Sequence, residues 1–372
     1  MKLKRLISDT LRRLRPRPER PAEASGVLLL SAGGLGDTVL FALVLPRFLE
    51  LARAGETVTV LLRADGARMA FLFPPRVEVI KVDFGRLAKD PAYRGATFDD
   101  LYRAHYRLVV STDFKRHPDL DEALAFACEA AESAAMRARP WAKYQSRLDA
   151  NEKRWGRLVD SGPALQDKVV RWSRFASELT GRALPPPRVA LSPEQMPAPV
   201  ELPGPTVIVQ PFSAVRAKQS PPELYARIAA SLPPGWRMRI AGHPSDLDKN
   251  PDYRPLLELS NVSFEPAPFS ELAGIMRGAA LVISVDTACM HLAAALGVPT
   301  LCLASAGFVG EIVPYADEVM PGNLKVLYRP MDCAGCLGDC RLKAVNSMFP
   351  CVAALDSDAI LTDIARMVEG GS

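Results

Sequence analysis

The chain has 372 residues, of which 48% are hydrophobic and 24% are charged, and this balance is ordinary for a globular protein with two domains. The formal net charge of +4 and the lack of an aromatic-rich basic stripe argue against a nucleic-acid partner. No apolar run approaches the roughly 20 residues that span a bilayer, and the first residues lack the apolar block of a secretory signal. These features predict a cytoplasmic protein.

The first 26 residues form a basic segment that we expect to be distinct from the rest of the chain. Eight Lys or Arg residues stand there against three acidic residues. The apolar residues of the segment fall near one helical face: Leu3, Leu6, Ile7, Leu11 and Leu14. A basic amphipathic helix suits an anionic membrane surface. Two interpretations stay open, a helix on the cytoplasmic face of the inner membrane and a solvated, partly disordered tail.

From residue 27 onward, short apolar segments alternate with longer helical segments. The expected strands of the first half are 27–31, 57–62, 77–82 and 107–112, and its clearest expected helices are 38–54 and 120–138. Strands that alternate with helices predict a parallel sheet with helices on both faces. Residues 27–185 are therefore predicted to form a first Rossmann-like α/β domain.

A proline-rich stretch interrupts this alternation. Residues 184–205 hold eight prolines, and proline fixes φ and removes a backbone donor, so we expect a linker over 186–205. The alternation then resumes, with strands expected at 206–210, 237–241, 281–285 and 299–303 and helices at 221–232, 270–277, 287–296 and 357–369. Residues 206–372 are predicted to form a second Rossmann-like domain, whose last helix is a candidate for packing back onto the first domain.

Two such domains predict a central cleft, and ligands of parallel sheets bind beyond the carboxyl ends of the strands. The loop after the first strand holds Gly33, Gly34, Gly36 and Asp37. It lacks the lysine of a P-loop and the spacing of a GxGxxG fingerprint, which disfavours a plain dehydrogenase. Asp37 has two interpretations, a helix N-cap and a general base at the mouth of the cleft, and the local sequence alone favours the cap.

In the second domain, Arg216 and Lys218 follow the strand at 206–210 and precede a helix that begins with proline. Cations on a loop after a strand suit a diphosphate group. The alternative is an exposed basic loop without a ligand.

The segment "LVISVDTACMHLAAALGVPTL" is the stronger signal in this domain. A buried strand ends at Asp286, and a helix begins at once with Thr287 and Ala288. The N-terminus of a helix attracts anions through its unpaired N–H groups and its dipole. Asp286 is expected either to hold a sugar hydroxyl or to cap the helix. His291 lies about one turn further on and carries little weight by itself.

Three segments together resemble glycosyltransferase family 9, the lipopolysaccharide heptosyltransferases. They are "GGLGDTVLFALVLPRFLEL", "QPFSAVRAKQSPPELYARIAASL" and "LVISVDTACMHLAAALGVPTLCL". The resemblance covers roughly residues 27–368, although residues 113–185 match poorly. Two departures are Ala288, where the family usually has glycine, and "KQSP", where Lys-x-Trp-Pro is commoner.

The resemblance implies a GT-B fold, in which two Rossmann-like domains face a central cleft. It also implies an inverting, metal-independent glycosyltransferase that needs no cofactor for catalysis. The expected donor is a nucleoside-diphosphate sugar, in this family ADP-heptose. The expected acceptor is the lipopolysaccharide core or another surface glycan or glycolipid.

Residue by residue, the resemblance gives Asp37 the role of general base. It assigns Lys218, with Arg216 beside it, to the donor diphosphate. The donor-site turn corresponds to Asp286, Thr287, Ala288 and His291. Gly242 and Asp246, in "IAGHPSD", match the segment that reaches the donor nucleoside.

Four cysteines near the end of the chain are arranged as C-x2-C-x3-C-x10-C: Cys333, Cys336, Cys340 and Cys351. The first spacing recurs in thiolate metal sites, and four cysteines complete a tetrahedral site. The cluster resembles that of autotransporter heptosyltransferases, which hold iron with four cysteines. Two interpretations stay open, a structural zinc or iron site and a reduced loop with no ion.

Two other functions compete with sugar transfer. A nucleotide-sugar epimerase on the same fold would convert the donor without an acceptor. A non-catalytic nucleotide-sugar-binding protein would be indifferent to the loss of the Asp37 carboxylate.

Overall fold

The computed structural model describes residues 15–369, and the chain divides into two compact units. The first unit comprises residues up to 164 together with 171–185, and the second comprises residues 165–170 and 186 onward. Most of the expected N-terminal amphipathic helix lies outside the described residues, and residues 15–26 contain no helix or strand. Among the described residues, no helix is both long and apolar enough to cross a membrane.

The first unit is built on a six-stranded parallel sheet in the order β3-β2-β1-β4-β5-β6. Its strands are β1 (Val27–Ser31), β2 (Val58–Arg63), β3 (Val77–Val82), β4 (Leu108–Ser111), β5 (Glu132–Met136) and β6 (Arg157–Val159). β1 lies in the middle, with Val27 opposite Val58 on one side and Leu108 on the other. The strand order reverses between β1 and β4, and such a switch point is where parallel sheets bind ligands.

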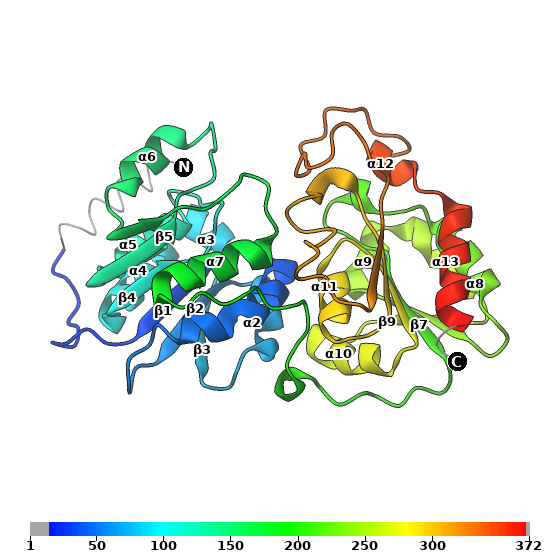
Figure 1. Cartoon of the computed structure of the whole chain (residues 1–372), viewed down its shortest axis with the longest axis horizontal. Helices are drawn as coiled ribbons and strands as arrows, with labels where there is room; N and C mark the ends of the chain where they lie inside the picture. Colours follow the sequence, from blue (N-terminus) through cyan, green and yellow to red (C-terminus); the bar gives the residue numbers. More distant parts are fainter. Residues whose placement is uncertain (1–14, 370–372) are drawn as a thin grey trace. The chain divides into compact units, whose positions relative to one another are not determined.

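Helices cover both faces of this sheet (Figure 1). Helices α3 (Phe84–Lys89), α4 (Pro91–Ala104) and α5 (Asp121–Ala127) share one apolar core with the strands. Helices α2 (Leu35–Leu49) and α7 (Lys168–Thr180) contact each other through ring pairs such as Phe41 with Trp172, whose centroids are 5.5 Å apart. Two further elements of this unit are the short η1 (Gly66–Leu72) and α6 (Gln145–Glu152).

The helix expected over 120–138 is wrong in its second half. The helix α5 ends at Ala127, and residues 132–136 form the strand β5 instead. Ala134, Ala135 and Met136 are buried beside β4 in the sheet. Alanine favours a helix in isolation, but this weak preference yields where small side chains fit between the sheet and its covering helices.

The second unit repeats the design with the strand order β12-β11-β10-β7-β8-β9. Its parallel strands are β7 (Thr206–Gln210), β8 (Arg237–Ala241), β9 (Val262–Glu265), β10 (Leu281–Val285), β11 (Thr300–Leu303) and β12 (Leu324–Leu327). Its helices are α8 (Pro222–Ser231), α9 (Pro244–Lys249), α10 (Phe269–Gly278), α11 (Ala288–Ala295), α12 (Pro350–Ala353) and α13 (Ser357–Glu369). The switch point of this sheet lies between β7 and β10, with Leu281 opposite Val207.

The last helix, α13, packs within the second unit. Ile360, Ile364 and Val368 join a core that also contains Tyr225 and Ile228 of α8, and Figure 1 shows the two helices side by side. The sequence-based candidate, in which this helix packs on the first domain, is therefore wrong. The apolar stripe of α13 is already covered by α8 and the strands beneath it.

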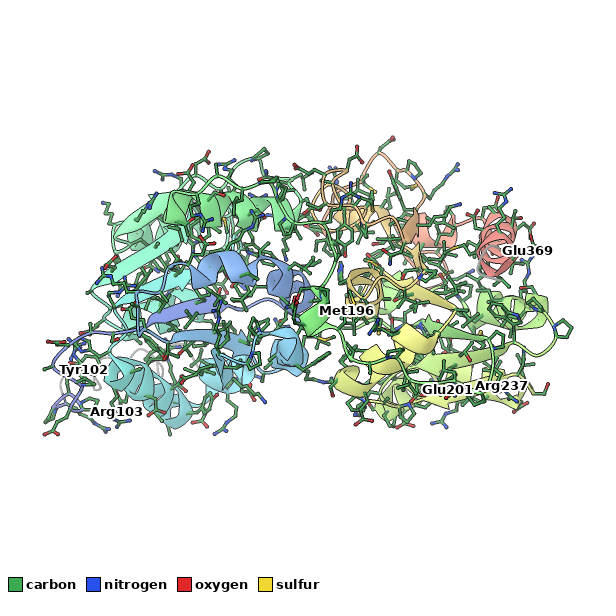
Figure 2. All side chains as sticks on the ribbon, turned by 60° about the horizontal axis from the view of Figure 1, so that its bottom comes forward. Tyr102, Arg103, Met196, Glu201, Arg237 and Glu369 are labelled. Carbon is green, nitrogen blue, oxygen red and sulfur yellow. The ribbon has the colours of Figure 1, made fainter. Side chains whose placement is uncertain are left out.

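The proline-rich stretch is attached to the second unit rather than lying free. Backbone N–H groups of Val189, Leu191 and Val200 donate to carbonyl groups of Val319, Ala295 and Gly274. The stretch includes the short η2 (Pro193–Gln195), and Met196 and Glu201 mark its course in Figure 2. Prolines prevent a helix or central strand here, but the remaining N–H groups still find partners.

Residues 165–170 also belong to the second unit, although they come before its main sequence range, which begins at residue 186. The Lys168 N–H donates to the Glu311 carbonyl over 3.0 Å, and a carboxylate oxygen of Asp167 accepts from the Ala316 N–H over 3.1 Å. The chain therefore passes between the units after residues 164, 170 and 185.

Candidate active site

The loop between β1 and α2 lies at the switch point of the first sheet. Gly34 is the N-cap residue of α2, and Asp37 is the third helical residue. Asp37 Oδ2 accepts the Gly34 N–H over 2.8 Å, so its carboxylate caps the helix from the first turn rather than from the N-cap position. A Cβ atom on Gly33 would lie 2.4 Å from Asp37 Cβ, so only glycine fits at this position. Gly36 lies inside the first turn of α2.

Two residues that the sequence analysis did not single out surround this loop. The Asp113 carboxylate accepts the Ala32 N–H over 2.6 Å. The hydrogen bonds that Arg63 donates to the Asp65 carboxylate raise the pKa of Arg63, and the charges of Asp37 and Asp113 raise it further. The sequence could have indicated Arg63 and Asp113 through their places at strand ends. Arg63 is the last residue of β2, and Asp113 follows β4 by two residues. The carboxyl ends of β1, β2 and β4 thus gather one cation and several carboxylates.

Asp121, near this cluster, gives the protein a testable pH dependence. Burial, and next the charge of Asp113, raise the pKa of Asp121 from 3.8 to about 7. Because the folded-state pKa is the higher one, ionisation opposes folding, and stability is lost as pH rises from about 4 to about 7. The Asp121→Asn variant is expected to match the wild type in thermal midpoint at pH 4 and to exceed it by several degrees at pH 8. Equal midpoints at pH 8 would contradict the raised pKa.

The second half of the candidate site is an ion pair at the switch point of the second sheet. Lys218, at the end of the short η3 (Arg216–Lys218), donates from Nζ to the Asp286 carbonyl over 2.7 Å. Its Nζ also lies 3.0 Å from Asp286 Oδ2, and both side chains are largely buried. Lys218 follows β7 and Asp286 follows β10, so the pairing of these two strands brings the predicted residues together.

Two unpredicted residues complete the environment of this pair. Ser305 Oγ donates to Asp286 Oδ2 over 3.0 Å, and the Phe308 ring centroid lies 4.7 Å from Lys218 Nζ. Burial raises the pKa of Asp286, while Lys218 and Ser305 favour its charged form. The other oxygen, Asp286 Oδ1, is buried without a hydrogen-bond partner among the described residues. Ser305 follows β11, and this place after a strand is the sequence feature that could have indicated Ser305 as a site residue.

Helix α11 begins directly beside this pair. Thr287 is its N-cap residue, but the Thr287 hydroxyl donates to Gln210 Oε1 over 2.8 Å instead of capping the helix. Ala288 is the first helical residue and is buried. Because the first N–H groups of a helix have no intrahelical partner, this terminus favours an anion.

Two predicted residues have other partners. Arg216 forms an ion pair with Asp252 and donates to Asn250 Oδ1 over 2.9 Å, so its charge is compensated away from the Lys218 ammonium. His291 is buried, and its Nδ1 hydrogen-bonds the Tyr315 hydroxyl. Neither contact involves the pair of Lys218 and Asp286.

The segment expected to reach the donor nucleoside forms the turn between β8 and α9. Asp246 Oδ2 accepts the His243 N–H over 2.9 Å and so caps α9. A Cβ atom on Gly242 would lie 2.8 Å from the Phe212 ring, so a residue with a side chain would clash with this ring. Burial, together with the charge of Asp246, raises the pKa of Cys289 in α11 to about 12.

The four C-terminal cysteines do not fit a metal site as they stand. Among residues 15–369, no group of three or more cysteine, histidine or carboxylate side chains is arranged to hold a metal ion. Cys351 is buried, and its Sγ accepts the Ala306 N–H over 3.4 Å. Cys333, Cys336 and Cys340 are only partly buried. The Cys351 thiol thus contacts the backbone of η5 (Ala306–Phe308), and a metal site on the four cysteines stays a prediction.

Comparison with known proteins gives one family and a consistent fold. Residues 144–325 match the family described as glycosyltransferase family 9 (heptosyltransferase). A family 9 glycosyltransferase from Veillonella parvula has a TM-score of 0.68 at 14% identity, covering 95% of this chain and all of that one. The Escherichia coli heptosyltransferase WaaC, solved with ADP-2-deoxy-2-fluoro heptose, has a TM-score of 0.67 at 19% identity, with 91% and 99% covered. No curated protein sequence matches significantly.

A further structural similarity is to an iron-containing enzyme. The iron-containing dodecameric glycosyltransferase TibC of enterotoxigenic E. coli has a TM-score of 0.53 at 14% identity, covering 95% of this chain and 78% of that one. At this identity the similarity extends to the fold alone, so the iron of TibC says nothing about this chain.

The two parallel sheets have the GT-B fold of the solved glycosyltransferases, and the family match over residues 144–325 indicates a glycosyltransferase. Residues 144–325 match family 9, and this range contains two of the three segments that resemble that family. The matched range contains Lys218, Asp286, Thr287 and His291, whereas Asp37 precedes it.

Proposed function

We propose that this enzyme transfers a heptose from ADP-heptose to the lipopolysaccharide core or a related surface glycan, with inversion at the anomeric carbon. The observation that carries the proposal is the buried Lys218 ammonium, held by Asp286 beside the first turn of α11. A fixed cation next to a helix N-terminus is suited to a diphosphate leaving group.

The donor half of the site supplies the charge that departure of the nucleotide requires. Two contacts of Lys218 Nζ go to Asp286, and an ammonium has three N–H groups, so one remains for a phosphate oxygen. The α11 N-terminus adds further N–H donors. Asp286 Oδ1, which is buried without a partner in the described residues, is positioned to accept a hydroxyl of the donor sugar. We assign the adenosine to the turn that carries Gly242 and Asp246.

The acceptor half supplies the base. Asp37 accepts the proton of the acceptor hydroxyl, whose oxygen attacks the anomeric carbon while the bond from that carbon to the diphosphate breaks. Asp37 already accepts the Gly34 N–H through Oδ2, and it lies within the electrostatic reach of Arg63.

The identities of nucleotide and sugar rest on similar proteins. WaaC was solved with an ADP-heptose analogue, and E. coli ADP-heptose lps heptosyltransferase II has a TM-score of 0.59 at 13% identity. A glycolipid acceptor would place the enzyme at the membrane surface. The basic N-terminal segment is the part expected to touch the membrane, and this remains a prediction, since residues 1–14 are outside the described range.

Nucleotide selectivity is the first test. ADP is expected to raise the thermal midpoint of the purified protein more than UDP, GDP or CDP does. At about 100 times the dissociation constant, ADP should add roughly 2.7 kcal/mol of stability. Selective stabilisation by UDP or GDP would contradict the ADP-heptose assignment, and no response to any of the four would contradict the donor site itself. Conversion of the donor without an acceptor would favour the epimerase alternative.

A further inference from the structure

A group of aromatic and basic side chains lies at the carboxyl edge of the first sheet, beside the residues already described. Lys115 and His117 belong to the loop after β4, whereas Trp141, Lys143 and Tyr144 belong to the segment between β5 and α6. β4 and β5 are parallel neighbours, so both loops leave the sheet at the same edge. We call these five residues the aromatic–lysine cluster.

The three rings of the cluster contact one another in every pairing. The ring centroids lie 5.8 Å apart for His117 and Trp141, 4.4 Å for His117 and Tyr144, and 4.6 Å for Trp141 and Tyr144. All three side chains are partly exposed, unlike the ring pair of Phe41 and Trp172, which is buried in the core. The cluster therefore leaves rigid apolar area in contact with solvent.

Both lysines of the cluster are exposed, and each ammonium lies beside a ring. Lys115 Nζ is 4.8 Å from the Trp141 ring centroid, and Lys143 Nζ is 5.2 Å from that of Tyr144. Within residues 15–369, neither ammonium forms an ion pair with a carboxylate. Two ammonium groups without an ion-pair partner are suited to a carboxylate or a phosphate group of a ligand.

The backbone beneath the cluster is held by contacts of its own. Arg116 is buried, and its Nη1 donates to the Met136 carbonyl at the end of β5 over 2.6 Å. The Arg139 N–H donates to the Phe114 carbonyl over 2.7 Å, so the loops after β4 and β5 are joined directly. Loops that are already fixed lose little conformational freedom when a ligand binds.

The same loop after β4 reaches the segment that carries the proposed base. The Asp113 carboxylate accepts the Ala32 N–H over 2.6 Å, and Asp113 precedes Lys115 by two residues. Ala32 begins the glycine loop that leads to Asp37. All of these residues belong to the first unit, whereas the proposed donor groups belong to the second. A ligand of the cluster therefore lies on the acceptor side of the proposed reaction.

We propose that the aromatic–lysine cluster binds an acidic sugar of the acceptor, with the sugar ring against Trp141 and Tyr144 and its carboxylate or phosphate group at Lys115 and Lys143. Sugar rings expose C–H groups that pack on aromatic side chains, and an ammonium forms charge-assisted hydrogen bonds with either anion. The cluster then selects acceptors by their charge. The inference rests on the proposed sugar transfer, which makes this ligand an acceptor.

The test measures binding of a lipid-free lipopolysaccharide-core oligosaccharide to the full chain by calorimetry, without a donor. Lys115→Met is expected to bind it about tenfold more weakly than the wild type does, which corresponds to the loss of one charge-assisted hydrogen bond. The matched variant Lys153→Met replaces an exposed lysine of the same unit outside the cluster, and it should bind normally.

Two modified oligosaccharides identify the anion. If Lys115 binds a carboxylate, reduction of the carboxyl groups to alcohols should weaken wild-type binding by about the same factor and abolish the difference between wild type and Lys115→Met. If Lys115 binds a phosphate, removal of the phosphates should do so instead. Trp141→Ala should weaken binding of all forms, whereas Trp141→Phe, which keeps a ring, should bind more tightly than Trp141→Ala.

Three results would overturn the inference: no binding of the native oligosaccharide, equal affinities of Lys115→Met and Lys153→Met, and wild-type binding that neither modification weakens. Heptose transfer from ADP-heptose to the same oligosaccharide is measured in parallel. Binding that depends on Lys115 without any transfer would contradict the proposed function and leave the acidic-sugar site in place. Transfer that does not depend on Lys115 would contradict the acidic-sugar site alone.

Discussion

The Asp37→Asn variant is expected to lose sugar transfer by a factor of roughly 10²–10⁴, the usual contribution of a positioned general base. An asparagine oxygen can still accept the Gly34 N–H that Asp37 Oδ2 accepts now, so the start of α2 should remain intact. It cannot, however, take a proton from an acceptor hydroxyl. The measurement is the initial rate with ADP-heptose and a lipopolysaccharide-core acceptor.

Folding and donor binding serve as controls for this substitution. The thermal midpoint and the stabilisation by ADP should match the wild type, because Lys218 and α11 belong to the other unit. Unchanged transfer with a normal midpoint would leave Asp37 with its capping role alone. This result would also indicate that another residue deprotonates the acceptor, and Asp113 would be the next carboxylate to replace.

Removing the Lys218 ammonium is expected to have the largest combined effect on stability and binding. Lys218→Met leaves the Asp286 carboxylate buried beside a methionine, with Ser305 as its remaining described side-chain partner. Loss of one member of a buried pair costs about 3–5 kcal/mol. The variant should therefore show a lower urea midpoint and no stabilisation by ADP.

The double variant Lys218→Met with Asp286→Asn separates these two effects. A neutral amide costs much less to bury than an uncompensated carboxylate, so part of the lost stability should return. Stabilisation by ADP should not return, because the cation is still missing. If the double variant regained ADP binding, Lys218 would have a purely structural role.

Most strands were predictable from sequence, including the edge strand β3, whereas the interior strand β5 and the edge strands β6, β9 and β12 were not. β1, β7 and β10 are fully buried and appear as continuous apolar runs. β6, β9 and β12 lie at sheet edges and are partly exposed, so their short sequences mix charged and apolar residues. A half-exposed strand of three or four residues carries no periodic signal that separates it from a loop.

The site was predictable where it depends on strand ends, and not where it depends on packing. Lys218 and Asp286 were both assigned to the donor site in advance, although not as an ion pair, and each follows a central strand of the same sheet. Ser305 and Phe308 come from a third strand end, and nothing in their local sequence marks them as partners of that pair. Asp37 was correctly placed at the start of α2, but its capping position depends on the helix beginning at Leu35.

Residues 165–170 limit how the gene can be divided. This six-residue insertion comes from the middle of the first unit's sequence, yet it satisfies backbone groups of the second through Asp167 and Lys168. A fragment that begins at residue 186 would leave the Ala316 N–H and the Glu311 carbonyl without these partners. Recombination at a single junction therefore cannot exchange an intact donor half between relatives. A chimera that keeps both halves stable has to carry this short insertion along with residues 186 onward.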